Sequence, residues 1–335
     1  MINSQHSGAP QHHRAFAISV AWTLSLLLLG SIVHATESSL ACPDWPTCFG
    51  SYMPVMEGGV FWEHIHRLWA GGLILMFALG TWFAFREGAS KSVKTAAVGG
   101  VLLLLVQAVF GGLTVIMQLP DAISTSHLSM ALLFLCLTTV LAVATSPRRT
   151  TRPPLSPEVR RDLKVWGTAS AVLIFAQSVV GGLVRHTDAG MACPDFPTCG
   201  GEWVPTITNH LVGLHFAHRV MGVLATLAVV ILAVRLLRRP VALTVRRFAL
   251  GAIALVTLQM TLGVVSVLSI LAVVPVSLHT LGAAALLWLL VVMATWGWVG
   301  WGAEPADQTR EGSSSRPRGE IPVGAARSPE SPPDA

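Results

Sequence analysis

Eight long apolar segments dominate the sequence, and each is long enough to cross the ~30 Å hydrocarbon core of a bilayer as an α-helix. Hydrophobic residues make up 53% of the chain and charged residues only 12%, a balance that excludes an ordinary soluble protein. We therefore predict an all-α integral membrane protein with eight transmembrane helices, at about residues 15–35, 64–85, 95–118, 127–146, 165–184, 213–235, 247–271 and 277–300.

The loops between these segments differ in charge. Lys and Arg are concentrated in three connections, residues 86–94, 148–164 and 235–247, whereas residues 119–126 and 272–276 contain neither. Basic loops lie on the cytoplasmic side, so we expect a multi-pass plasma-membrane protein with both termini in the cytoplasm. The long loops before the second and sixth segments then face outward. The net charge of +5 reflects this topology and indicates no nucleic-acid partner.

Both ends of the chain are polar. Residues 1–14 and 302–335 have compositions that do not support a packed core, and we expect both to be disordered cytoplasmic tails. His6, His12 and His13 fall in the first tail and are assigned no role. A cleaved signal peptide is the alternative interpretation of the first apolar segment, but this segment is longer than a usual signal peptide.

The sequence contains an internal repeat. Residues 41–48, Ala-Cys-Pro-Asp-Trp-Pro-Thr-Cys, recur at 192–199 with Phe in place of Trp. Further matches follow at an offset of 152, namely His66-Arg67 with His218-Arg219 and His127 with His279. We therefore expect two pseudo-symmetric four-helix bundles, residues 15–146 and 165–301, joined by a cytoplasmic linker at 147–164. Because each half crosses the membrane four times, the two halves have the same orientation.

Four histidines are candidate haem ligands. Ionisable side chains are expensive inside a membrane, so each histidine in a span is a candidate functional residue. In the predicted topology four of them lie at the same depth, at the outer ends of their spans: His66, His127, His218 and His279. Two imidazoles from neighbouring helices supply both axial ligands of a haem iron, so one pair in each half predicts two haem sites.

Two other roles for these histidines are less favoured. An interfacial histidine can simply hydrogen-bond a neighbouring helix, but four histidines at duplicated spacing favour ligation. A closed structural zinc site needs four converging ligands, and each outer loop supplies only two cysteines. We therefore favour haem over zinc.

Glu63 breaks the repeat. It precedes His66 by three residues and shares a helix face with it, whereas the corresponding position in the second half is His215. A carboxylate beside a haem could act as a general base or stabilise positive charge that develops during oxidation. A negative charge at a helix N-terminus is the structural alternative. The difference between the halves favours a catalytic role for Glu63.

Arg67 and Arg219 directly follow two of the candidate ligands. A guanidinium there could bind the propionates of a porphyrin, so both are candidate cofactor-binding residues. An arginine that extends to the membrane interface is the equal alternative. His64 lies two residues from His66 and is expected to point away from the ligand face.

The chain has five cysteines. Cys42 and Cys48, and likewise Cys193 and Cys199, flank Pro-x-x-Pro segments in the outward loops, which predicts two disulfides within loops. Each disulfide could be a structural crosslink or a redox-active pair. Cys136 lies alone in an apolar segment and is expected to serve packing.

Three glutamines are each followed by a glycine four residues later. Small residues let helix backbones approach closely, so we expect these positions to be packing surfaces, although the glutamines could also reach a haem edge. The pairs are Gln107 with Gly111, Gln177 with Gly181, and Gln259 with Gly263.

Taken together, these motifs resemble the haem A synthase family, membrane enzymes that complete haem A for cytochrome oxidases. The resemblance spans about residues 15–300 and is carried by the cysteine motif at 41–48, by Glu63-x-x-His66-Arg67, and by the remaining ligand candidates. Members usually have an arginine before the first cysteine pair. Arg185 matches this arginine in the second half, whereas the first half has His34 there.

The resemblance implies an activity and an allocation of the two sites. The family oxidises the C8 methyl of haem O to a formyl group by two successive hydroxylations and loss of water. On this basis His66 and His127 hold haem O as substrate, His218 and His279 hold a haem b cofactor, and Glu63 serves the oxidation. Haem O synthase, oxidase assembly factors, membrane lipid and a further copy of the chain are the partners it suggests.

Two other functions remain alternatives from the sequence. A di-haem b electron-transfer cytochrome would need no lone carboxylate and would gain from haems on opposite membrane faces. A transporter would favour sites at the membrane midplane and broken helices, neither of which is evident in this sequence.

Overall fold

The computed structural model describes residues 9–149 and 154–301, and this part of the chain has eight helical spans long and apolar enough to cross a membrane. The all-α membrane fold predicted from the sequence is therefore confirmed. Seven spans are single helices: α1 (Gln11–Ala35), α2 (Gly58–Arg86), α3 (Lys91–Ile116), α4 (Asp121–Ala144), α7 (His210–Leu237), α8 (Leu243–Leu268) and α9 (Val273–Val299).

The fifth span consists of three consecutive segments. It starts with the short helix α5 (Pro157–Asp162), continues as one π-helical turn, η2 (Leu163–Gly167), and ends as α6 (Thr168–His186). Short 3₁₀ turns, η1 (Pro147–Arg149) and η3 (Ala189–Met191), follow α4 and α6.

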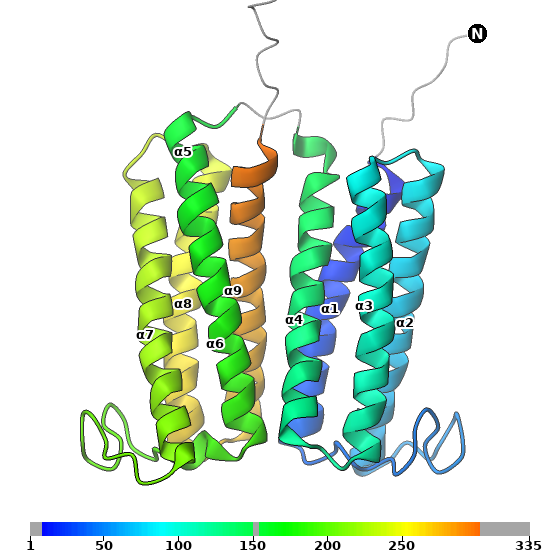
Figure 1. Cartoon of the computed structure of the whole chain (residues 1–335), viewed down its shortest axis with the longest axis vertical. Helices are drawn as coiled ribbons and strands as arrows, with labels where there is room; N and C mark the ends of the chain where they lie inside the picture. Colours follow the sequence, from blue (N-terminus) through cyan, green and yellow to red (C-terminus); the bar gives the residue numbers. More distant parts are fainter. Residues whose placement is uncertain (1–8, 150–153, 302–335) are drawn as a thin grey trace, which may run out of the picture.

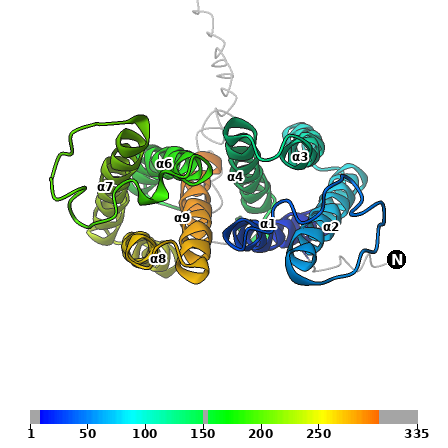
Figure 2. The ribbon, with the colours of Figure 1, turned by 90° about the horizontal axis from the view of Figure 1, so that it is seen from below.

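The helices form two groups of four that stand side by side, α1–α4 and α6–α9 (Figure 1). Seen from the end that carries the two long loops, the helices of each group are arranged around a common centre (Figure 2). The groups meet through four helices, since α9 packs against α1 and α4, and α4 packs against α6. One polar contact joins α1 to α9 at this interface, where the Ser31 hydroxyl donates to Thr280 Oγ1 at 3.1 Å.

Two apolar clusters fill the interior. In the first group, Phe77 packs against Phe16 and Phe134, with ring centroids 5.4 and 4.9 Å apart. A larger cluster surrounds α9, where Leu286, Leu290 and other side chains are fully buried. Because α9 contacts both groups, it is the most buried of the eight spans.

The short connections α3–α4 and α8–α9 have the same backbone geometry. Each has two consecutive residues with left-handed dihedrals, Gln118 and Leu119 in the first, and Ile270 and Leu271 in the second. The second residue of each pair donates its amide back into the preceding helix, from Leu119 at 2.7 Å and from Leu271 at 2.8 Å. These turns end α3 and α8 and start α4 and α9 at the end that carries the two long loops (Figure 1).

Helix α1 begins at Gln11, four residues before its predicted start. The Glu87 carboxylate accepts hydrogen bonds from the amides of Gln11 at 2.9 Å and His12 at 3.2 Å, which satisfies the free N–H groups of the first turn. The prediction of disorder is therefore wrong for His12 and His13, because Glu87 stabilises this end from the α2–α3 connection. His6 and the tail 302–335 lie outside the described residues.

Candidate haem-binding sites

The four candidate ligands lie near the loop-bearing ends of four helices. His127 and His279 are in the second turns of α4 and α9, and His66 and His218 are in the third turns of α2 and α7. His66 and His127 belong to helices of the first group, and His218 and His279 belong to helices of the second. The structure thus places one pair of imidazoles in each group of helices, as the spacing predicted.

Each of these imidazoles lies edge-on against a glycine of the preceding long helix. A methyl group added at the glycine would come within 2.9 to 3.2 Å of the imidazole Cε1 atom. Since real Cβ contacts are rarely this short, only glycine leaves the ring its space. The pairs are Gly30 with His66, Gly111 with His127, Gly181 with His218, and Gly263 with His279.

The surroundings of three of these imidazoles fit haem ligation better than a structural hydrogen-bond network. Nδ1 of His66, His127 and His279 is buried and has no hydrogen-bond partner among the described residues. Side chains retained for hydrogen bonding alone would be satisfied there, because an unpaired buried polar atom is costly. Two imidazoles in an apolar helix bundle are the donor set of a six-coordinate haem iron.

Three glutamines support the ligands from neighbouring helices. Nε2 of Gln107 donates to the backbone carbonyl of His127, and Nε2 of Gln259 donates to that of His279, both at 2.9 Å. Gln177 binds the His218 carbonyl at the same distance and lies 3.0 Å from its Nδ1 atom. The glycines are packing surfaces, as expected, and the glutamines in addition hydrogen-bond the histidine carbonyls. Their regular spacing before the glycines was the sequence signal for this contact.

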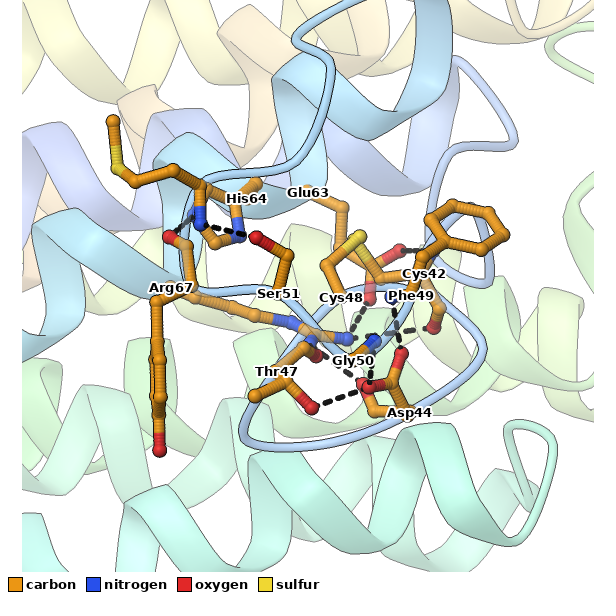
Figure 3. The surroundings of a disulfide bond; sticks show 12 residues. Cys42, Asp44, Thr47, Cys48, Phe49, Gly50, Ser51, Glu63, His64 and Arg67 are labelled. Atoms are coloured by element: carbon orange, nitrogen blue, oxygen red, sulfur yellow. Dashed lines mark hydrogen bonds and ion pairs between the residues drawn. A yellow bond between two sulfur atoms is a disulfide. The ribbon is translucent and has the colours of Figure 1, made fainter.

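Glu63 is buried and binds the loop that joins α1 to α2 (Figure 3). Its Oε2 accepts the Cys42 amide at 2.7 Å, and its Oε1 accepts the Arg67 guanidinium at 2.5 Å. This loop, residues 36–57, is called the first cysteine loop below. The carboxylate thus lies one turn from His66, between helix α2 and the cysteine loop.

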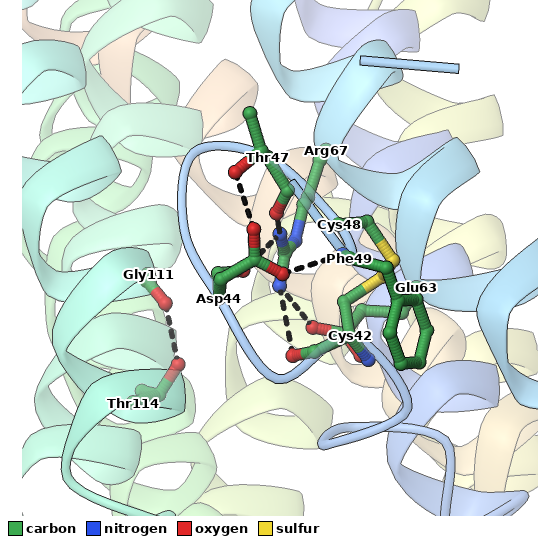
Figure 4. Close-up of polar contacts among 9 residues, drawn as sticks. All are labelled: Cys42, Asp44, Thr47, Cys48, Phe49, Glu63, Arg67, Gly111 and Thr114. Atoms are coloured by element: carbon green, nitrogen blue, oxygen red, sulfur yellow. Dashed lines mark hydrogen bonds and ion pairs between the residues drawn. A yellow bond between two sulfur atoms is a disulfide. The ribbon is translucent and has the colours of Figure 1, made fainter. Parts of the chain in front are cut away.

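Arg67 binds backbone carbonyls of the first cysteine loop (Figure 4). Its Nη1 donates to the carbonyls of Asp44 at 2.7 Å and Thr47 at 2.6 Å. Arg219 repeats this contact in the connection between α6 and α7, the second cysteine loop (residues 187–209), through the carbonyls of Asp195 and Thr198. Both guanidinium groups therefore hold loops, and the binding of propionates by Arg67 and Arg219 stays a prediction.

Both predicted disulfides are present, Cys42–Cys48 and Cys193–Cys199. Cys136 is a free thiol, and it packs against the larger apolar cluster, as expected. The prediction of two disulfides within loops is confirmed.

An aspartate organises each cysteine loop. Asp44 accepts hydrogen bonds from the Thr47 hydroxyl and from the amides of Gly50 and Phe49, which hold the pKa of its carboxyl group below the ordinary value. Asp195 accepts the same kinds of hydrogen bond from Thr198, Gly201 and Gly200, and its pKa is lowered for the same reason.

The residue corresponding to Glu63 in the second group has a different partner. His215 is buried, and its Nδ1 lies 2.9 Å from the carbonyl oxygen of Ala189. The break in the repeat therefore changes the local chemistry, because a carboxylate between two donors in one half becomes an imidazole on a carbonyl in the other.

His64 points toward the first cysteine loop and away from the ligand face, as predicted. Its Nε2 lies 3.0 Å from the Tyr52 carbonyl oxygen. Cys42, Cys48 and His64 form the one cluster of metal-ligand type among the described residues, but the two sulfurs are bonded to each other. A disulfide offers no thiolate to zinc.

The two groups share a polar cluster at their interface. Arg185 Nη2 lies 3.2 Å from His34 Nδ1, and His34 stacks near His186 with ring centroids 5.1 Å apart. Thr125 Oγ1 lies 3.1 Å from Nδ1 of His186. Thus His34 and Arg185, which occupy corresponding positions of the repeat, contact each other directly.

Comparison with known proteins agrees with this architecture. A family model described as cytochrome oxidase assembly protein matches residues 56–291. A protein of Symbiobacterium thermophilum named heme A synthase is 31% identical over 280 residues, which cover 79% of this chain and 89% of that protein. A heme A synthase of Shewanella oneidensis is 27% identical over 321 residues, covering 84% and 95% of the two chains. The chain therefore belongs to the cytochrome oxidase assembly protein family.

Proposed function

We propose that this chain is a haem A synthase, an oxidoreductase that converts the C8 methyl of haem O to a formyl group. The reaction consists of two successive hydroxylations followed by loss of water. Membership of the family and the names of the relatives support this assignment.

The observation that carries the proposal is the repeated packing of an imidazole against a glycine. Four histidines lie at the same end of their helices, each against a glycine, and they form one pair in each half. Such a pair suits a macrocycle held between two helices. Two such pairs of histidines in one chain suit an enzyme that holds a substrate haem and a resident haem at the same time.

We assign the substrate site to the first half and the cofactor site to the second. In this assignment His66 and His127 hold haem O, and His218 and His279 hold haem b, which supplies one-electron redox chemistry at its iron when bound. The support is Glu63, because a carboxylate stands beside the ligand in the first half only.

Glu63 is the proposed catalytic residue. It is buried one turn from His66, with one oxygen on the Cys42 amide and the other on Arg67. A carboxylate held in this way is positioned to take a proton from the reacting carbon or to stabilise positive charge that develops there. Arg67 and the Cys42 amide position it, and they also hold the first cysteine loop over the site.

The candidate sites lie near the outer face of the membrane in the proposed topology. Both termini are cytoplasmic, because the connections at the opposite end hold the basic residues. Haem O synthase and oxidase assembly factors are proposed partners in the bilayer, since both haem O and haem A are too apolar to cross water freely.

The function is tested by identifying the haems of the purified protein. The chain is expressed with a source of haem O, and its haems are extracted and identified by chromatography and mass, for the wild type, Glu63→Ala and the matched control His215→Ala. We expect haem b and haem A in the wild type and in the control. In Glu63→Ala we expect haem O or a hydroxylated intermediate in place of haem A.

Two other outcomes would overturn parts of the proposal. Two haem b per chain in the wild type, without haem A, would identify a di-haem cytochrome. Undiminished haem A in Glu63→Ala would remove that residue from the oxidation while leaving the activity in place.

A further inference from the structure

We propose that Gln107, Gln177 and Gln259 are positioning residues that fix three of the four ligand histidines, and that His66, which lacks such a glutamine, is the ligand that releases the haem when substrate and product exchange. The inference rests on the proposed function and deepens it, because it concerns how one haem is exchanged while the other is retained.

The three glutamine contacts share one geometry. Each amide nitrogen donates to the backbone carbonyl of its ligand histidine at 2.9 Å, from a helix that also carries the glycine beneath the imidazole. The contact thus fixes the backbone of the ligand relative to the glycine that receives its ring. Because the glutamine binds the backbone carbonyl, that turn of the ligand helix cannot move away from the iron without breaking a buried hydrogen bond.

Neighbouring residues make room for two of the amides. A methyl group added at Gly282 would collide with Oε1 of Gln259, and one added at Gly222 would lie 3.3 Å from Nε2 of Gln177. The corresponding position to Gly222 in the first half is Ala70. In the second half, a glycine thus lies next to each of these two amides.

His66 has the glycine without the glutamine. Gly30 lies against its imidazole as Gly181 lies against that of His218, but four residues before Gly30 the chain has Leu26. Leu26 packs into the apolar cluster of the first half and offers no hydrogen-bond donor to the His66 carbonyl. Among the described residues, His66 therefore packs against a glycine but has no glutamine on its backbone carbonyl.

Helices α1 and α2 are nevertheless joined firmly next to this point. Trp22 Nε1 donates to the Trp69 carbonyl at 3.1 Å, and Trp69 Nε1 donates to Ser25 Oγ at 2.9 Å. The indole rings stack with centroids 4.9 Å apart. The helix pair is thus held together by side chains near His66, while the His66 carbonyl itself has no glutamine like those of the other three candidate ligands.

This distribution suits one exchangeable and one resident haem. A substrate haem must be loaded and a product haem released in every catalytic cycle, whereas a cofactor must stay. Both ligands of the second half, His218 and His279, have a glutamine. In the first half only His127 has one.

The test measures haem release from each half separately. Purified protein that contains haem b is loaded with haem O and mixed with excess apomyoglobin, and the captured haems are separated by chromatography over time. Because the two haems differ chemically, each release rate reports one half. We expect Leu26→Gln to slow haem O release, and Gln177→Leu to speed haem b release, each by about threefold to tenfold, the effect of one net hydrogen bond.

Matched controls separate positioning from packing. Leu26→Met and Gln177→Met keep the volume but supply no amide, so Leu26→Met should release haem O at the wild-type rate and Gln177→Met should behave as Gln177→Leu. The low-spin absorption spectrum of the second-half haem should also weaken in both Gln177 variants.

The outcomes distinguish this inference from the proposed function. Unchanged haem O release from a Leu26→Gln protein that retains its haem b overturns the inference, as does unchanged haem b release from Gln177→Leu. Failure of the proposed function would instead appear as absence of haem A in the wild type. In that case the release rates of the haems would still depend on the glutamines.

Discussion

At the scale of single residues, each candidate ligand packs against a partner residue on another helix. The sequence alone does not show which residues form these pairs. The four histidines were predicted from their spacing, but a spacing does not reveal which side chain packs beneath a ring. The structure adds a glycine beneath each imidazole, in the preceding long helix. It also adds three glutamines on ligand carbonyls, because that contact depends on the rotation of two helices about their axes.

Replacing a seat glycine tests the role of this contact. In Gly181→Ala the new methyl group would lie 2.9 Å from Cε1 of His218, so the imidazole must move. We expect the second-half haem to lose its low-spin spectrum or to dissociate during purification. Gly99→Ala is the control, because a methyl group there meets no atom within 4 Å and alanine favours helix. An unaltered low-spin spectrum in Gly181→Ala would contradict the inference that Gly181 leaves the space that the His218 imidazole needs.

At the scale of elements, hydropathy located all eight spans but missed their outer starts. Helix α2 begins at Gly58 and not at 64, and α4 begins at Asp121 and not at 127. The missing turns contain polar residues such as Glu63 and Asp121, which reduce the mean hydropathy of a window although the helix continues through them. Glu63 and the candidate ligand histidines lie in or next to these turns. The apolar pattern therefore underestimates the length of the helices that carry the candidate sites.

Polar contacts fix the structure of the cysteine loops, and a hydropathy pattern does not predict such contacts. In each loop an arginine from the following helix binds loop carbonyls, and an aspartate binds loop amides. From the sequence, propionates and the membrane interface were equal alternatives for Arg67 and Arg219. The repeat of the cysteine motif and its following arginine was the available signal for a shared loop structure.

The order of the second cysteine loop should depend on pH. Asp195 has a lowered pKa because the Thr198 hydroxyl and the amides of Gly201 and Gly200 bind its ionised form. Its contribution to loop stability is therefore complete above the ordinary aspartate pKa of about 3.9 and is lost as the pH falls below that value.

Amide hydrogen exchange measures this contribution. We expect the protection of Gly200 and Gly201 to be constant near neutral pH and to fall once the pH drops below about 4. Asp195→Asn cannot ionise, so its protection should be lower at neutral pH and should not change across this window. The same fall in the Asn variant would show that another group is responsible.

At the scale of the whole molecule, two similar halves are joined into a unit with two different sites. The halves meet through α1, α4, α6 and α9, and near the end that carries the two long loops His34 of one half contacts Arg185 of the other. His34 and Arg185 are unlike residues at corresponding positions of the repeat, and so are Glu63 and His215. Two differences between the halves therefore lie near the ends of the helices that carry the candidate ligands.

The most direct test of the account is the haem content of two paired-ligand variants. One variant carries His66→Ala and His127→Ala, and the other carries His218→Ala and His279→Ala. We predict that the first retains one haem b per chain and forms no haem A, whereas the second lacks haem b. Loss of haem b from the first variant, or its retention by the second, would contradict the assignment of substrate and cofactor to the two halves.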